Sequence, residues 1–237
     1  MTLSPIGKVL RWSGASLARH GVLYGVLAVA AIALSWAIVA GSRLPEPLAI
    51  TLAGSTVAPV FTCIINAYSF ADWTGETGTA AVWARVLDRV WAVIIIDFIN
   101  TVLVTYAQAG IGGDPIVLLI GIPLLILAAA AAFADVAAVV DERTPWWGLA
   151  FVPFVTSIAT VFSRGLFTRA MSLLVLQLLI GYASDLIHLW LDSAKIGHAV
   201  FWALIPMGMI TLPGVQALLA FTYLDAATDE SKRPCSE

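Results

Sequence analysis

Residues 115–134 read PIVLLIGIPLLILAAAAAFA, a run without a single charged or hydrogen-bonding side chain. A helix of about 20 apolar residues is long enough to cross a hydrocarbon core of about 30 Å. The rest of the 237-residue chain has the same character, with 60% hydrophobic and 11% charged residues and a mean hydropathy of +0.95. Soluble domains are about 45–50% apolar and about 25% charged. The composition therefore excludes soluble, disordered, collagenous and disulfide-stapled proteins and predicts a polytopic α-helical membrane protein.

Six apolar stretches reach the length of a membrane span. We expect an all-α fold with six transmembrane helices, at 21–40, 48–70, 90–108, 115–139, 170–191 and 198–224. They form a transmembrane domain over 21–225, preceded by an amphipathic cytoplasmic segment, 1–20, in which 3–18 is an interfacial helix. Residues 80–90 read as a short cytoplasmic lead-in to the third span, and 226–237 as a polar cytoplasmic tail.

The segment 146–162 is the doubtful one, because its 17 or so apolar residues are at the lower limit for a span and Pro153 interrupts them. If it does not cross, ten of the 12 basic residues lie on the side of the N-terminus; if it crosses, only seven do. Basic residues in short loops favour the cytoplasm. We therefore expect both termini in the cytoplasm of a bacterial inner membrane, with 146–162 re-entrant or lying on the surface. The ten cytoplasmic residues are then Lys8, Arg11, Arg19, Arg85, Arg89, Arg143, Arg164, Arg169, Lys232 and Arg233.

Polar side chains inside the spans are the candidate functional residues, since a charged one costs about 2.5–3.5 kcal/mol at a helix centre. Asp97 is the most central, and Asn66, Asp97 and Asp135 fall in the cytoplasmic half of the predicted spans. They allow two interpretations, an inward-facing polar cleft that accepts a proton or cation, or hydrogen bonds that merely hold helices together. The candidate cluster is Asn66, Asp97, Asn100 and Asp135, under a basic rim of Arg85, Arg89, Arg164 and Arg169.

A second candidate cluster lies near the outer face, where Asp185 and His188 share one side of a helix and His198 begins the next span. Such residues can bind a metal or ligate a haem, but this spacing matches no known ligand pattern. We expect a hydrogen-bonded cluster there, with no metal and no cofactor. A net charge of −3 excludes a nucleic-acid-binding face. Cys63, in a span, and Cys235, in the tail, predict no disulfide.

Three passages carry a family resemblance: Trp83–Asp97, Ile122–Asp141 with the following Ser163–Gly165, and Ala217–Asp225. They resemble bacterial six-span membrane proteins such as the membrane domain of glycerophosphoryl diester phosphodiesterases and related uncharacterised families. The resemblance implies a six-helix fold with an amphipathic cytoplasmic segment and brings no established catalytic residues. Phosphodiesterase activity is not implied, because the chain shows no soluble phosphodiesterase domain.

The sequence contains no GxSxG, HExxH or CxxC motif, and its predicted loops are short. We therefore expect a non-catalytic integral membrane protein, an accessory, assembly or scaffold subunit that packs against lipid, another membrane protein or a second copy of itself. The alternative is a transporter or permease subunit that uses Asp97. A more remote alternative is a cofactor-binding protein or intramembrane enzyme that uses Asp185, His188 and His198.

Overall fold

The computed structural model describes residues 3–43, 46–111, 115–140, 151–193 and 213–228. Within these ranges the chain is helical and contains no strand, which confirms the predicted all-α class. The helices are α1 (Ile6–Gly41), α2 (Glu46–Thr74), α3 (Thr79–Ile111), α4 (Pro115–Ala131), α5 (Ala134–Val140), α6 (Phe151–Ser163) and α7 (Phe167–Ser193), followed by a helix over residues 213–227.

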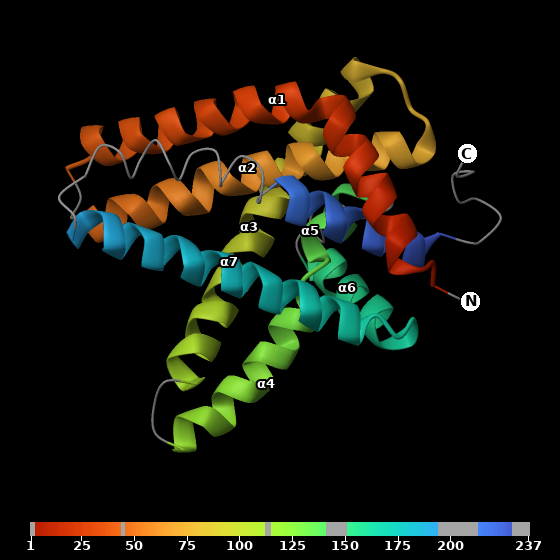
Figure 1. Cartoon of the computed structure of the whole chain (residues 1–237). Helices are drawn as coiled ribbons and strands as arrows, with labels where there is room; N and C mark the ends of the chain where they lie inside the picture. The colour runs from red at the N-terminus through yellow and green to blue at the C-terminus, as the bar shows by residue number, and fades with distance from the viewer. Residues whose placement is uncertain (1–2, 44–45, 112–114, 141–150, 194–212, 229–237) are drawn as a thin grey trace.

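The helices meet at one end of the molecule and separate at the other. Figure 1 shows the start of α1, the helix over 213–227, α5, α6 and the start of α7 together at this meeting point, while α1, α2 and α7 run out in one direction and the α3–α4 hairpin in another. We call the meeting point the polar end and define it as residues 4–20, 66–89, 130–139, 157–170 and 213–228. The remaining lengths of α1, α2, α3, α4 and α7 are called the apolar arms.

The core lies mainly at the polar end and is built largely from small residues. The alanine-rich stretch 128–138 is almost completely buried between α2, α3, α6 and α7. Small side chains let helix backbones approach closely, which is how helices in membranes gain packing contacts. Phe133 and Ile96 fill the larger spaces in two of these clusters. The run of alanines therefore joins neighbouring helices at the polar end.

The apolar arms leave large hydrophobic side chains exposed, and few of their helices meet the combined length, hydropathy and charge requirements of a membrane span. Two described stretches do, Ile6–Ser35 and Leu119–Val140. A third is obtained if α6 and the part of α7 up to Ile180, which meet at 118°, count as one broken span or re-entrant loop. By this measure the described residues provide two or three spans and do not support the six that the sequence predicts.

No helix break occurs at two of the predicted boundaries between surface and membrane segments. The interfacial helix 3–18 and the span 21–40 are one continuous helix, α1, which bends partway along its length (Figure 1). Likewise, the lead-in 80–90 and the span 90–108 are both part of α3. Neither junction contains a proline, so the backbone hydrogen bonds of the helix continue through both.

The predicted span 115–139 corresponds to the apolar stretch Leu119–Val140, but a turn at residues 132–133, which the sequence did not predict, separates α4 from α5 within it. The buried hydroxyl of Ser157, on α6, donates a hydrogen bond of 2.8 Å to the carbonyl oxygen of Ala130 beside this break. A carbonyl at a helix end needs such a partner when it is buried. The contact therefore stabilises the break and fixes α6 against it.

Helix α6 is too short to cross a membrane, since its 13 residues span only about 20 Å. It ends at a glycine in the left-handed region, Gly165, with φ +67. The N–H of Leu166 donates to the carbonyl of Val161 at 2.9 Å, and both side chains are fully buried. Together these are the backbone bond and apolar contact of a Schellman motif. The chain thereby reverses direction into α7.

Two other predicted segments lie partly outside the described residues. The doubtful segment 146–162 is described from Phe151 onward, where it forms most of α6. The predicted last span, 198–224, is described only from residue 213, and the helix there continues to residue 227, beyond the predicted end. The polar tail 226–237 therefore begins as a helix.

Replacing Gly165 with alanine tests the turn between α6 and α7. No atom lies within 4 Å of the added Cβ, so the expected loss of about 1–2 kcal/mol in unfolding free energy comes from the backbone conformation alone. Gly14→Ala, in the middle of α1 and equally open, is the matched control and is expected to stabilise by about 0.5–1 kcal/mol. Thermal unfolding in one detergent compares them, and equal changes for both variants would contradict the turn.

Candidate functional site

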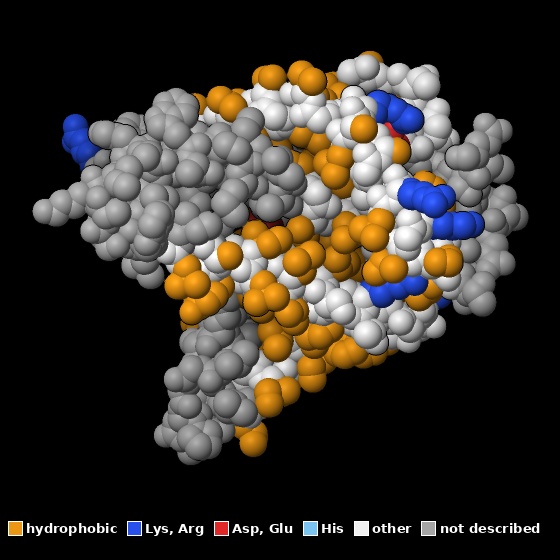
Figure 2. Space-filling view, in the orientation of Figure 1, with side chains coloured by type: hydrophobic (Ala, Val, Ile, Leu, Met, Phe, Trp, Pro, Cys, Tyr) orange, Lys and Arg blue, Asp and Glu red, His pale blue; other side chains and the backbone are white. Residues whose placement is uncertain are grey.

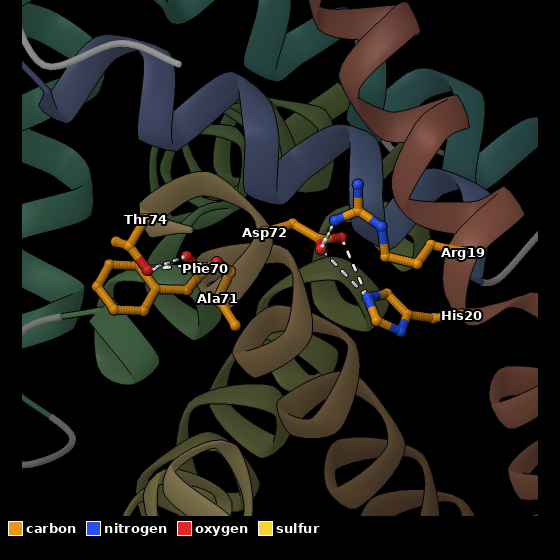
Figure 3. A network of polar contacts seen from close by, with 6 residues as sticks. All are labelled: Arg19, His20, Phe70, Ala71, Asp72 and Thr74. Carbon is orange, nitrogen blue, oxygen red and sulfur yellow. Dashed lines mark hydrogen bonds and ion pairs between the residues drawn. The ribbon is translucent and has the colours of Figure 1, made fainter. Parts of the chain in front are cut away.

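The candidate site lies at the polar end, around the turn between α2 and α3. Helix α2 ends there at Gly75, which has φ +75 and is followed by a hydrogen bond of 2.9 Å from the N–H of Glu76 to the carbonyl of Ala71. This is again the backbone bond of a Schellman motif. The Thr74 hydroxyl donates to the carbonyl oxygens of Phe70 and Ala71, which closes the last turn of α2 (Figure 3). The turn therefore holds the polar side chains on both of its sides in place.

On one side of this turn, two residues of α1 converge on one carboxylate of α2. The guanidinium of Arg19 forms an ion pair with Asp72, and the Nε2 atom of His20 lies 3.2 Å from the Asp72 carboxylate (Figure 3). The His20 ring also packs against Tyr68, at a centroid distance of 4.7 Å, and against Tyr24, at 5.9 Å. Because the Arg19 side chain is 64% exposed, its ion pair contributes less than about 1 kcal/mol to stability.

These residues border a cavity of about 230 Å³ between α1 and the α2–α3 turn. Its walls carry both signs of charge, together with an aromatic ring and hydroxyl groups. We call it the α1–α2 polar cavity; its lining includes Arg19, His20, Tyr68, Asp72, Glu76, Thr77 and Thr79.

A second cavity, of about 370 Å³, lies on the other side of the turn, between α3 and α5, and shares Glu76 with the first. Two arginines of the predicted basic rim line it. Arg85 lies 4.1 Å from the centroid of the Phe70 ring and 3.7 Å from Glu76. The largely buried Arg89 donates from Nε to the Asp88 carboxylate at 2.8 Å. Carboxylates therefore neutralise this part of the rim.

The other two rim arginines lie elsewhere, so the structure divides the predicted rim. Arg164 is exposed at the corner between α6 and α7. Arg169 donates from Nη2 to the carbonyl oxygen of Ser4 at 2.6 Å. Ser4 in turn donates from its backbone N and its hydroxyl to the fully buried Asp225 carboxylate, at 2.8 and 2.7 Å. These residues tie both ends of the described chain to the start of α7.

The predicted intramembrane cluster is also divided. The fully buried Asn66 accepts a hydrogen bond of 3.0 Å from the side-chain amide of Gln216, on the helix over 213–227. Asp97, on α3, and the buried Asp135, on α5, lie near enough for their charges to interact, and the Cys63 thiol of α2 donates a hydrogen bond of 3.9 Å to the carbonyl oxygen of Val86 on α3.

Two oxygens near this acidic pair are buried and make no hydrogen bond within the part of the chain that the structure describes. They are Oδ1 of Asp135 and Oδ1 of Asn100. A buried carboxylate oxygen without a partner is unfavourable and is typical of functional sites as well as of strained cores. The structure thus brings Asp97, Asn100 and Asp135 to the α3 and α5 side of the core and places Asn66 on another side.

The predicted outer-face cluster remains a prediction. Asp185 and His188 are in α7, but their side chains are outside the described residues, as is all of His198. Among the residues that the structure describes, no group of three or more His, Cys, Asp and Glu side chains is arranged to hold a metal ion.

Sequence reasoning missed three contacts that the structure shows to be central: the pairs Arg19–Asp72 and Asn66–Gln216, and the buried Asp225. Gln216 and Asp225 are polar residues at the two ends of the largely apolar stretch 216–225, QALLAFTYLD. That is the same signal that identified Asp97. It was available for both residues, whereas their partners could not be read from local spacing.

Comparison with known proteins adds no relative: no protein-family model matches the chain, and no curated protein or solved structure matches it either. The resemblance to the membrane domain of glycerophosphoryl diester phosphodiesterases therefore remains a prediction from its three passages. The function must be argued from the geometry.

The Asn66–Gln216 hydrogen bond gives a test of the missed contact. Gln216→Leu leaves the buried Asn66 amide without its partner and is expected to lower stability by about 1–3 kcal/mol. The double variant Asn66→Leu with Gln216→Leu removes both polar groups and is expected to be more stable than the single variant. Thermal unfolding of both single variants and the double variant measures the coupling, and strictly additive losses would contradict the pairing.

Proposed function

We propose that the chain is a non-catalytic integral membrane protein, an accessory, assembly or scaffold subunit whose apolar arms pack against lipid and a membrane partner. The observation that carries the proposal is the surface of these arms. Within Ile6–Ser35, only 12% of an apolar stretch of 18 residues is buried in the protein. Many large apolar side chains are more than half exposed, among them Val22, Val26, Leu34, Phe98, Tyr106, Leu119, Ile120, Leu179 and Tyr182.

An apolar surface of this extent requires an apolar environment. Soluble monomers rarely expose contiguous apolar patches above a few hundred Å². Figure 2 shows hydrophobic side chains spread along the arms on the visible face, while basic side chains gather at the polar end. The hydrocarbon core of a membrane covers such arms, and a partner helix covers the part of their surface that lipid does not.

The distribution of basic residues supports an orientation. Of those that the structure describes, Lys8, Arg11, Arg19, Arg85, Arg89, Arg164 and Arg169 lie at the polar end, whereas Arg43 follows the opposite end of α1. Since basic residues in short loops favour the cytoplasm, we place the polar end there. The shortness of α6 supports a segment that does not cross. Six crossings with both termini cytoplasmic, in a bacterial inner membrane, are part of this proposal.

The α3–α4 hairpin is the arm that we assign to the partner, because it projects from the other helices (Figure 1). Leu119 on α4 is 77% exposed, and Leu119→Ala is expected to reduce recovery of a stoichiometric partner at least tenfold. A tenfold loss corresponds to about 1.4 kcal/mol of binding free energy, within the range of interface hot spots. The measurement is affinity purification from membranes in a mild detergent.

Leu87→Ala is the matched control for this experiment. Leu87 is 72% exposed but lies on α3 at the polar end, outside the projecting hairpin. Its recovery of partner is expected to equal that of the wild type. A wild-type protein that purifies as a monomer alone, or equal effects of the two variants, would contradict the proposed role.

Transport is the second candidate function, and the interacting carboxylates Asp97 and Asp135 favour it. The proposed accessory role predicts that proteoliposomes take up protons after an acid pulse no faster than empty vesicles. A transporter predicts uptake that Asp97→Asn abolishes and that Asp88→Asn, a 67% exposed aspartate on the same helix, leaves unchanged. The accessory role fails if this second pattern is found in variants that remain folded.

A further inference from the structure

A third cavity, which is apolar, also lies between α1 and α2. It is farther along the arms than the α1–α2 polar cavity. Its volume is about 310 Å³, and nearly all of its walls are aliphatic. It is open to the outside, since Leu34 and Val60 in its walls are partly exposed. The residues that shape it include Leu27, Ala31, Leu34, Val57, Val60 and Ile64.

The two cavities lie in line along the contact between α1 and α2. On α1, His20 of the polar cavity is followed by Leu27, Ala31 and Leu34 of the apolar one, at helical spacings of seven, four and three. Residues so spaced share one face of a helix. On α2, Tyr68 of the polar cavity follows Ile64 of the apolar one by four residues.

The residues where the two cavities approach each other contact the same core. Leu27 and Tyr68 both pack against the buried cluster that contains Ile64, Ala71 and Val82. Ala71 and Val82 line the polar cavity, and Ile64 lines the apolar one. The two cavities therefore lie in line, a charged one at the polar end (the mouth) and an apolar one between the arms (the track), and together we call them the α1–α2 groove.

The charges at the mouth favour a dipolar group over an anion. Arg19 provides a positive charge but already pairs with the Asp72 carboxylate, which His20 also faces, and Glu76, 3.7 Å from Arg85, adds a second carboxylate. A phosphate alone would meet two carboxylates. A phosphate that carries an ammonium group a few atoms away meets a cationic partner at one end and an anionic partner at the other.

We infer that the α1–α2 groove binds one phospholipid with a zwitterionic ethanolamine headgroup, with the headgroup between Arg19, His20 and Glu76 and an acyl chain along Leu27, Ala31 and Val60. The inference rests on the proposed membrane location. The mouth of the groove is lined by Tyr68, and tyrosine is enriched at the depth of lipid headgroups. The residues that line the apolar cavity would bury the acyl chain.

Native mass spectrometry of the full chain tests the site, with palmitoyl-oleoyl phosphatidylethanolamine and phosphatidylglycerol as the two probes. The wild type is expected to retain one phosphatidylethanolamine with at least tenfold preference over phosphatidylglycerol. Glu76→Gln removes the ammonium partner and is expected to lower that preference about tenfold. Ala31→Phe fills the track and is expected to abolish retention of both lipids.

Ala33→Phe is the control for the track, because Ala33 is exposed on α1 and does not line the groove. It is expected to retain lipid like the wild type. If Ala31→Phe does not give a monodisperse protein, Val60→Trp on the opposite wall replaces it. Equal retention in the track and control variants overturns the site, as does a dimer that Ala31→Phe dissociates without loss of lipid. Equal or stronger retention of phosphatidylglycerol overturns the headgroup assignment.

Alkaline carbonate extraction separates this inference from the proposed function. If the protein stays in the membrane pellet but retains no lipid in the groove, only the lipid site fails. If carbonate releases the protein into the supernatant, the membrane location fails and the lipid site with it.

Discussion

The buried carboxylate of Asp225 is the contact on which the arrangement of the chain depends. It lies in the last described helix, accepts two hydrogen bonds from Ser4 at the start of the chain, and is linked through Ser4 to Arg169 at the start of α7. A fully buried carboxylate is tolerated only where such donors compensate for lost water. Both chain ends and the α6–α7 corner are therefore held together at one end of the molecule.

This constraint explains the contrast between the two ends. At the polar end, hydrogen bonds, ion pairs and the alanine-rich core join nearly every helix. Along the arms, the surfaces are aliphatic, and in lipid there is no hydrophobic force to drive such surfaces together. Helices fixed at one end and apolar at the other leave grooves for acyl chains, such as the one between α1 and α2. The proposed accessory role and the proposed lipid site both follow from this division.

Part of this architecture could be predicted from the sequence. Composition alone gives the all-α class. The positions of the basic residues in the sequence predict that most of them lie at the same end of the helices. Arg85 and Arg89 lie together as expected, because one turn of a helix separates them. The structure shows no helix break at the expected boundaries between the surface and membrane parts of α1 and α3, since polar residues change the environment of a helix without ending it. The break before α5 was missed because a run of alanines is a strong helix signal, and only the contact with Ser157 reveals why the break is stable.

The pairing of polar residues could not be predicted, because it depends on helix order in space rather than on spacing in sequence. Asn66 bonds to Gln216, 150 residues away, and not to Asp97. Arg19 and His20 meet Asp72 only because α1 and α2 are antiparallel neighbours. Local periodicity tells which face of a helix is polar, but it contains no information on which helix lies opposite.

The division into a polar end and lipid-covered arms is tested most directly by the accessibility of nitroxide labels in proteoliposomes. Labels at Val29 and Leu179 report on the arms, and labels at Arg11 and Arg164 report on the polar end, each in a chain with both native cysteines replaced. We expect the arm labels to collide more with oxygen than with a water-soluble nickel complex, and the polar-end labels to show the reverse. Arm labels as accessible to nickel as the label at Arg11 would contradict the account.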